Sequence, residues 1–291
     1  MSTTHGYSEK ENFNRVLRRD HPSRVCFPPP SRGGCYAGAW PAALRPSAGT
    51  LQWRDEWGVT WTDEEGEVFP TGPAVKSCEA IDDLRAPAPD AAGRFDQFRT
   101  DVAEIDRERF FVSVNHPYFL YEKVIDILGP EEFGVAMLIA PEKAHRVLDM
   151  VLDFELGVAR HYVEARPDHV NLSDDYGHQD RLAMSPECWR EFFAPRIRRI
   201  LSFYSNELGD DITVSLHSCG HVMPILEDLM DLGIDVLNPV QSTANDLARM
   251  REITSGRLTL CGGIDGQVIL PCGSPADVRE EVFRKMDLLW E

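Results

Sequence analysis

A histidine and a cysteine lie two positions apart in the strand-like run Thr-Val-Ser-Leu-His-Ser-Cys-Gly, residues 213–220. Residues i and i+2 of an extended chain point to the same side, so we expect the imidazole of His217 and the sulfur of Cys219 to converge. Imidazole nitrogen and thiolate sulfur together suit zinc. The alternative is a turn histidine, hydrogen-bonded to backbone, beside an inert buried cysteine.

A third residue of this kind, Cys261, ends a second strand-like run just before a glycine turn. His217, Cys219 and Cys261 would supply three protein ligands and leave the fourth position of a tetrahedral zinc open, as catalytic zinc sites do. A single cysteine in an apolar run is also often a core residue. Cys261 is therefore a candidate third ligand.

Two adjacent aspartates, Asp174 and Asp175, follow the strand-like run 169–173. Neighbouring residues of a strand point to opposite sides, so only one of them can face a ligand. That carboxylate would act in catalysis as a general acid or base, or would accept hydrogen bonds from substrate N–H groups. Aspartate at a strand end also commonly caps a helix or loop.

Other polar residues fall at expected strand ends or in the loops beside them. Asn238, Gln241 and Asp265 lie where strands give way to turns, so either they line a pocket (Asp265 as a further catalytic candidate) or they serve turn chemistry. His116 and His178 are loop histidines that would bind substrate or shuttle a proton, the alternative being solvated or capping roles.

These residues belong to a regular alternation of strands and helices that begins near residue 106. We expect strands at 110–114, 169–173, 212–217, 235–240 and 257–261. We expect helices at 118–128, 141–165, 185–193, 222–231, 244–254 and 275–289. Repeated β-then-α units imply parallel strands with right-handed crossovers, so a doubly wound sheet and a (β/α)8 barrel both fit. In either fold, chemistry takes place at the carboxyl ends of the strands.

The chain reads as one α/β domain. Residues 1–10 are expected to be a disordered N-terminus, and residues 11–291 a single barrel domain. Its part 11–105 is irregular, with a hairpin near 57–69, and its part 106–291 consists of βα units. The last expected helix runs nearly to the final residue, so we expect a TIM barrel that lacks its last strand at the C-terminus.

Composition restricts the function. The 291 residues carry a formal net charge of −18, which argues against binding nucleic acid through its phosphates. The seven cysteines are odd in number and scattered, which is not typical of a disulfide framework. The N-terminus has no signal-peptide core, and no apolar run approaches the roughly 20 residues of a membrane span. We therefore expect a cytoplasmic protein that binds neither nucleic acid nor membrane.

Several segments, taken in order, resemble the uroporphyrinogen decarboxylase superfamily, whose members include zinc-dependent corrinoid methyltransferases on a (β/α)8 barrel. The segments are residues 133–142, 172–179, 217–220, 233–241 and 260–265. True uroporphyrinogen decarboxylases carry an Arg-Gln-Ala-Gly-Arg motif on the first strand, which grips a substrate with many carboxylates. The corresponding residues here, 26–34, leave only Arg24 and Arg32 nearby, which does not provide the clustered cations that such a substrate needs.

The resemblance therefore favours the methyltransferase branch. It implies zinc at His217 and Cys219, and methyl transfer between a methylcorrinoid, supplied by a partner protein, and a thiol or pterin acceptor. In that branch the third ligand lies near the final strand, so Cys261 would be a substitute from one strand earlier. The alternatives are decarboxylation of a tetrapyrrole, as in porphyrin biosynthesis, and a non-catalytic or incomplete member of the family.

Overall fold

The computed structural model describes residues 7–18, 20–24, 31–35 (backbone only) and 51–290. Its main element is a six-stranded parallel sheet in the order β1-β5-β6-β7-β8-β9. The strands are β1 (Ser31–Cys35), β5 (Phe111–His116), β6 (His169–Ser173), β7 (Thr213–His217), β8 (Val236–Val240) and β9 (Thr259–Gly262). All five strands expected from the sequence are present, so the α/β prediction is confirmed.

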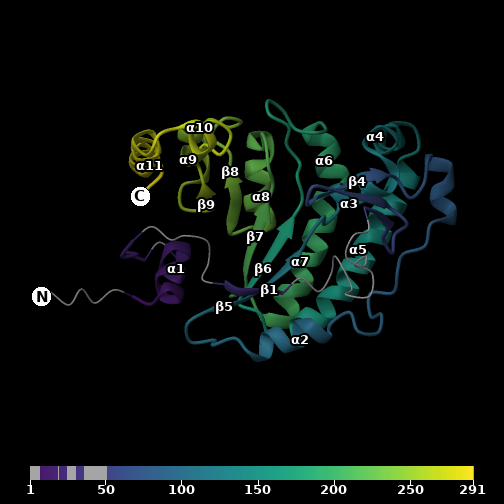
Figure 1. Ribbon diagram of the computed structural model, residues 1–291, viewed down its shortest axis with the longest axis horizontal. Helices are drawn as coiled ribbons and strands as arrows, with labels where there is room; N and C mark the ends of the chain where they lie inside the picture. The colour runs from purple at the N-terminus through teal and green to yellow at the C-terminus, as the bar shows by residue number, and fades with distance from the viewer. Residues whose placement is uncertain (1–6, 19, 25–30, 36–50, 291) are drawn as a thin grey trace, which may run out of the picture.

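Helices connect these strands and surround the sheet (Figure 1). They are α1 (Glu9–Arg18), α2 (Asp96–Ala103), α3 (Tyr121–Leu128), α4 (Pro130–Ile139), α5 (Pro141–Glu164), α6 (Pro186–Phe192), α7 (Ala194–Leu208), α8 (Leu226–Leu232), α9 (Leu247–Thr254), α10 (Ile269–Cys272) and α11 (Pro275–Leu289). Short 3-10 helices precede α2 (Cys78–Asp83) and α8 (Met223–Ile225). Figure 1 shows α5, α6 and α7 on one side of the sheet, and α9, α10 and α11 near β9.

Local sequence explains where several helices begin. Proline occupies the first turn of α5, where its missing N–H is not needed. The side chain of Ser185 accepts a hydrogen bond from the backbone of Cys188 and caps α6, as its position predicted. Ser274 and Asp277 form a reciprocal capping box at the start of α11. Each device satisfies backbone N–H groups that would otherwise lack a partner.

The two faces of the sheet differ in chemistry. On the face that packs against the helices, in-register rows are apolar: Val114, Val170 and Val214 form one, and Leu172 and Leu216 belong to the next. All five are buried, and they form part of the main hydrophobic core. Burial of such side chains contributes most of the favourable free energy of folding.

The opposite, inner face carries a row of hydrogen-bonded polar side chains. The Asn171 amide donates to Asn115 Oδ1 (2.6 Å), and Ser215 donates to Asn171 Oδ1 (2.6 Å). His169 bonds Ser215 through Nε2 (2.8 Å) and Ser113 through Nδ1 (2.7 Å). These side chains satisfy one another, which is the condition for placing polar groups inside a fold.

A small antiparallel sheet packs beside the start of α3. It contains β2 (Gln52–Arg54), β3 (Thr60–Glu64) and β4 (Glu67–Gly72), and β3 and β4 are the expected hairpin. The ring of Trp61 lies edge-on to that of Tyr118, with centroids 5.7 Å apart. This contact places the hairpin beside the loop that follows β5.

The sheet does not close on itself within the described residues, because β1 and β9 each pair with one neighbour only. Helix α1 begins at Glu9, within the segment expected to be disordered. Residues 25–30 and the side chain of Arg32 lie outside the described part, so the comparison with the first-strand arginine motif stays a prediction. Arg24 is exposed.

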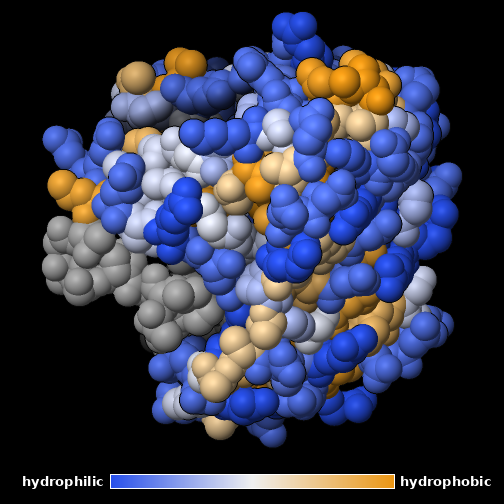
Figure 2. Space-filling model, turned by 90° about the vertical axis from the view of Figure 1, so that its right-hand side faces the viewer, coloured by the Kyte–Doolittle hydropathy of each residue, from blue (hydrophilic) through white to orange (hydrophobic). Residues whose placement is uncertain are grey.

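The surface is mainly hydrophilic, in keeping with the net charge (Figure 2). This view shows the side that bears α4 and the hairpin, where hydrophobic residues form separate patches. Leu138 and Ile139 of α4 are 76% and 74% exposed. None of the helices that the structure describes combines the length and apolar character needed to cross a membrane.

Candidate metal centre at the carboxyl ends of the strands

Three strands deliver polar side chains to the same end of the sheet. Ser173, His217 and Asn238 are in register across β6, β7 and β8. Asp175 follows β6 by two residues, and Cys219 follows β7 by two residues. Because parallel strands all end at one edge, these side chains meet at a common mouth.

Asp175, His217 and Cys219 form a cluster of possible metal ligands, with one ligand atom from each lying within 4.8 Å of the others. His217 Nε2 lies 3.7 Å from Cys219 Sγ and 3.8 Å from Asp175 Oδ1. The His217 and Asp175 side chains are 35% and 36% exposed, so solvent and a substrate can reach them. The structure thus places His217 beside Cys219 and adds a carboxylate.

A second residue orients the His217 ring. Its Nδ1 donates a hydrogen bond of 2.8 Å to Asn238 Oδ1, while the Asn238 amide nitrogen donates to Cys261 Sγ at 3.2 Å. With its proton on Nδ1, the imidazole directs a free lone pair on Nε2 toward Cys219 and Asp175. Ligating histidines in proteins are commonly fixed through the other ring nitrogen in this way.

The Cys219 loop is held from two sides. Asp175 Oδ1 accepts the backbone N–H of Cys219 at 2.8 Å, and Gln241 Oε1 accepts the N–H of Gly220. Gly220 has φ of +78°, and a Cβ at this position would overlap the carbonyl group of Gly177. Only glycine allows this close approach of two backbones, which joins the loops after β6 and β7.

The ionisable groups at the mouth are mainly acidic. Burial, together with the Asp175 and Glu122 carboxylates, raises the pKa of Cys219 to about 12. Burial also raises the pKa of Glu122 to about 8, assisted by Asp174 and Asp175. Among the side chains that the structure describes, no lysine or arginine forms an ion pair with Asp175 or Glu122. A bound cation would lower these raised pKa values and favour the ionised thiolate and carboxylates.

The donor set fits zinc. Zinc–sulfur bonds of about 2.3 Å and zinc–nitrogen bonds of about 2.0–2.1 Å at a tetrahedral angle separate nitrogen and sulfur by roughly 3.6 Å. The distance between His217 Nε2 and Cys219 Sγ is 3.7 Å. Carboxylate, imidazole and thiolate would hold the ion and leave a fourth position toward the open mouth.

Of the two adjacent aspartates, only Asp175 faces the cluster. Asp174 is fully buried and points toward α3, where it accepts hydrogen bonds from backbone N–H groups. Burial raises the pKa of Asp174 to about 6, against the lowering effect of those hydrogen bonds. Asp174 therefore caps a helix, which was the alternative to a catalytic role in the sequence analysis.

The structure places His116 away from the mouth. The side chain is buried on the helix-covered face, where Nδ1 bonds Glu155 at 2.6 Å and Nε2 bonds Tyr204 at 2.7 Å. Since both nitrogens are satisfied among the helices, His116 is not positioned to bind a substrate at the mouth.

The remaining predicted residues do not belong to this group of close donor atoms. Cys261 lies outside the group of close donor atoms and is linked to His217 by a hydrogen bond from Asn238. Asp265 Oδ1 caps a turn by accepting the N–H groups of Gln267 and Val268. His178 is an exposed residue at the rim, and its carbonyl accepts the N–H of His221. The structure therefore brings Asp175, rather than Cys261, beside His217 and Cys219.

Sequence reasoning missed Glu122 and treated Asp175 only as a catalytic candidate. A signal for Glu122 existed, because α3 begins just after β5, and the first turn of such a helix lies at the carboxyl ends of the strands. An acidic residue in that turn is therefore a candidate for the site.

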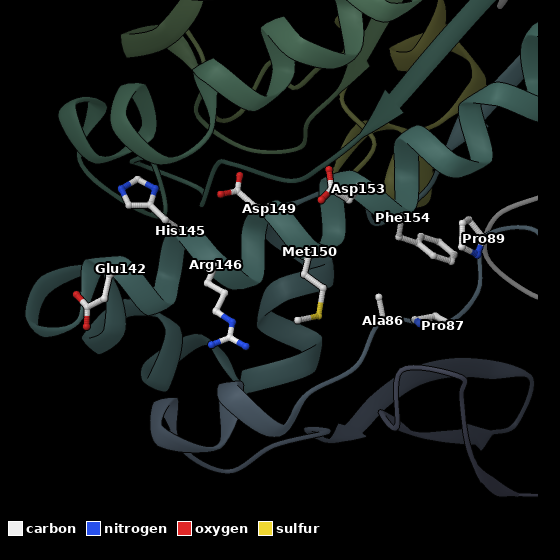
Figure 3. Close-up of a pocket in the computed structure, with 10 residues that line it drawn as sticks. All are labelled: Ala86, Pro87, Pro89, Glu142, His145, Arg146, Asp149, Met150, Asp153 and Phe154. Carbon is white, nitrogen blue, oxygen red and sulfur yellow. The ribbon is translucent and has the colours of Figure 1, made fainter.

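A groove lies elsewhere, on the outer side of α5 (Figure 3). This groove of about 840 Å³ runs between α5 and the proline-containing segment 86–89. Asp149, Asp153 and Phe154 are among its lining residues. No residue of the metal cluster lines it, so the groove and the strand-end site are separate features.

Comparison with known proteins identifies the class. Residues 57–289 match the family model described as uroporphyrinogen decarboxylase (URO-D). The match covers most of the chain, so the chain belongs to the uroporphyrinogen decarboxylase family.

Within this family, the chain is similar to methyltransferases. It is 26% identical over 156 residues to the "Methylcobamide:CoM methyltransferase MtaA" of Methanosarcina barkeri, a match that spans 54% of this chain and 43% of the relative. The protein of the same name from M. barkeri strain Fusaro is 25% identical over the same length. The chain therefore aligns with less than half of these curated relatives.

A solved structure described as "methyltransferase from Methanosarcina mazei" has the same fold. It superposes with a TM-score of 0.68 at 18% identity, and the match covers 97% of this chain and 90% of that one. This likeness confirms the predicted barrel-type fold, although the barrel is not closed among the described residues of this chain.

Proposed function

We propose that this protein transfers a methyl group from a methylcorrinoid to a thiol, using zinc bound by Asp175, His217 and Cys219. The observation that carries the proposal is the convergence of one oxygen, one nitrogen and one sulfur within 4.8 Å at the open end of the sheet. The similarity to methylcobamide:CoM methyltransferases supports methyl transfer in a corrinoid-dependent context. The methylcorrinoid would arrive as a substrate on a partner protein.

The reaction follows from the site chemistry. Zinc would lower the pKa of an acceptor thiol, so that the thiolate forms at neutral pH. The thiolate lone pair forms the new carbon–sulfur bond while the methyl–cobalt bond breaks, and the electrons of that bond stay on cobalt, which changes from Co(III) to Co(I). The thiol proton leaves to solvent through the open mouth.

The side chains have distinct roles. His217 would bind zinc through Nε2, because Asn238 holds its proton on Nδ1. Cys219 would bind as the thiolate, which the cation stabilises against the burial that raises its pKa. Asp175 would supply the third ligand and at the same time hold the backbone of Cys219.

Metal content and methyl transfer test the proposal together. Purified protein is expected to hold one zinc per chain by elemental analysis. It should convert methylcobalamin and a small thiol, under anaerobic conditions, into cob(I)alamin and the methyl thioether detected by mass spectrometry. Cys219→Ser should lose both properties, whereas the matched variant Cys261→Ser should keep the metal.

Other outcomes would point elsewhere. A protein that holds no stoichiometric metal, and whose activity does not respond to Cys219→Ser, would overturn the proposal. Methylation of a pterin but not of a thiol would retain the site and change the acceptor. Release of carbon dioxide from uroporphyrinogen would instead assign the decarboxylase reaction.

A further inference from the structure

The buried Asp174 carboxylate caps a helix that is distant in sequence. Its Oδ2 accepts the N–H groups of Leu120 (3.1 Å) and Tyr121 (2.8 Å), and its Oδ1 accepts the N–H of Glu122 (2.8 Å). Leu120, at the N-cap position of α3, has no side-chain oxygen that could do this. The first turn of α3 therefore depends on Asp174 for its hydrogen bonds.

The same residue is joined to two of the proposed metal ligands. Its backbone N–H donates to the carbonyl oxygen of His217 at 2.9 Å, and Asp175 is the next residue of the chain. Glu122, in the first turn of α3, faces the same loop, since the Asp174 and Asp175 carboxylates are among the groups that raise the pKa of its side chain. Asp174 and Glu122, joined by the bond from the Glu122 N–H to Asp174 Oδ1, are here called the α3 clamp, and they link the helix to the ligand-bearing loop.

We propose that the α3 clamp positions Asp175 and His217 for metal binding, with Asp174 as the main positioning residue. This inference rests on the proposed function, because it concerns the same metal centre. Asp175 lies beyond the end of β6, where no ladder of backbone hydrogen bonds orients it. The clamp supplies that missing constraint from the helix side.

The physical reason lies in preorganisation. A ligand on an unrestrained loop loses conformational freedom when it binds a metal, which weakens binding. Replacing a residue that orients a metal ligand typically lowers metal affinity about 10- to 100-fold. The clamp is built from buried hydrogen bonds to a charged acceptor, which are stronger than neutral ones.

Asp174→Asn tests the inference with little change of shape. The amide that replaces one carboxylate oxygen cannot accept an N–H from α3. We expect the affinity for Co²⁺, measured by competition with a chromophoric chelator, to fall about 10- to 100-fold. The visible absorption of the Co²⁺ protein should also change, because fewer ligands remain in the original geometry.

Asp126→Asn is the matched control. Asp126 is a buried carboxylate residue of α3 and is 9% exposed. It forms no hydrogen bond to Asp175 or His217 among those that the structure describes. The Co²⁺ affinity and spectrum of this variant should equal those of the wild type, even if its melting temperature changes. Equal losses in both variants would indicate general destabilisation and would overturn the proposal.

A second pair of variants serves if Asp174→Asn does not fold. Glu122→Ala removes the α3 side chain that faces Asp175 and should lower Co²⁺ affinity, whereas Glu122→Gln keeps a side chain of the same size with an acceptor oxygen and should retain that affinity. An equal loss in both Glu122 variants would contradict positioning of Asp175 by this side chain.

Hydrogen exchange separates failure of the clamp from failure of the proposed function. Without any added metal, Asp174→Asn should accelerate amide exchange at Cys219, whose N–H is bonded to Asp175, while Asp126→Asn should not. Unchanged exchange at Cys219 would refute the clamp. If the wild type binds no metal but Asp174→Asn still accelerates exchange at Cys219, only the proposed function is refuted.

Discussion

His169 makes the fold sensitive to acid in a way that one substitution can isolate. The residue lies on the inner face of β6, only 5% exposed, and both ring nitrogens are hydrogen-bonded to serine hydroxyls, those of Ser113 and Ser215. Burial lowers the pKa of His169 from 6.5 to about 4. In the unfolded chain the same ring would take up a proton near pH 6.5.

The size of the effect follows from linkage. Because the folded-state pKa is depressed, the stabilisation is present above pH 6.5 and is lost as the pH falls toward 4. Between pH 7 and pH 4.5, a shift from 6.5 to about 4 removes about 2.5 kcal/mol of the free energy of unfolding. Carboxylates with raised pKa values stabilise the folded state as the pH falls, which opposes the effect of His169. The contribution of His169 is therefore measured as the difference between the wild type and a variant that lacks this histidine.

His169→Asn removes the titrating group and keeps hydrogen-bonding capacity. Urea unfolding followed by tryptophan fluorescence would be measured at several pH values for the wild type and the variant. The stability difference between them should shrink by about 2.5 kcal/mol from pH 7 to pH 4.5. His178→Asn, at an exposed site, should leave the profile unchanged. Parallel pH profiles of the wild type and His169→Asn would refute the reasoning.

Three further predictions concern the metal, a loop contact and a buried acid. Chelation of bound divalent metal should lower the melting temperature of the wild type, and Cys219→Ser should abolish this response, as thermal scans with and without EDTA would show. Gly220→Ala should destabilise by more than the roughly 1–2 kcal/mol expected from a positive φ alone, because Cβ would overlap Gly177. Gly209→Ala, with φ of +91° and open space around it, is the control in the same denaturation assay. Burial raises the pKa of Asp126 to about 7, so the folded state loses stability as the pH rises from about 4 to 7. Asp126→Asn should therefore gain in melting temperature over the wild type as the pH rises to 8; a constant difference would contradict this.

Much of the fold could be predicted because local signals agree with tertiary structure. The proline at 141 and the apolar periodicity after it marked α5, and Ser185 marked the start of α6. Helix α4 was missed for a physical reason. Its sequence, PEEFGVAMLI, is apolar on almost every side, so it lacks the one-sided stripe that distinguishes a helix from a strand.

The candidate site was predictable only in part. The two-residue spacing of His217 and Cys219 is enough to place both side chains on one side of the chain. The choice between Asp175 and Cys261 depends instead on how separate loops approach one another. That approach is decided by backbone contacts, such as the one between the β6 and β7 loops, which a single sequence does not encode in any local pattern.

The polar row on the inner face of the sheet has a consequence for how this scaffold can diversify. The apolar burial that holds the domain together lies on the opposite face, against the helices. An exchange of one hydroxyl or amide for another along the inner row would therefore leave the apolar core in place, but the new side chain would have to preserve the hydrogen bonds of its neighbours. In a fold divided in this way, changes of polar side chains on the inner face are limited by the hydrogen-bond network and not by the hydrophobic core.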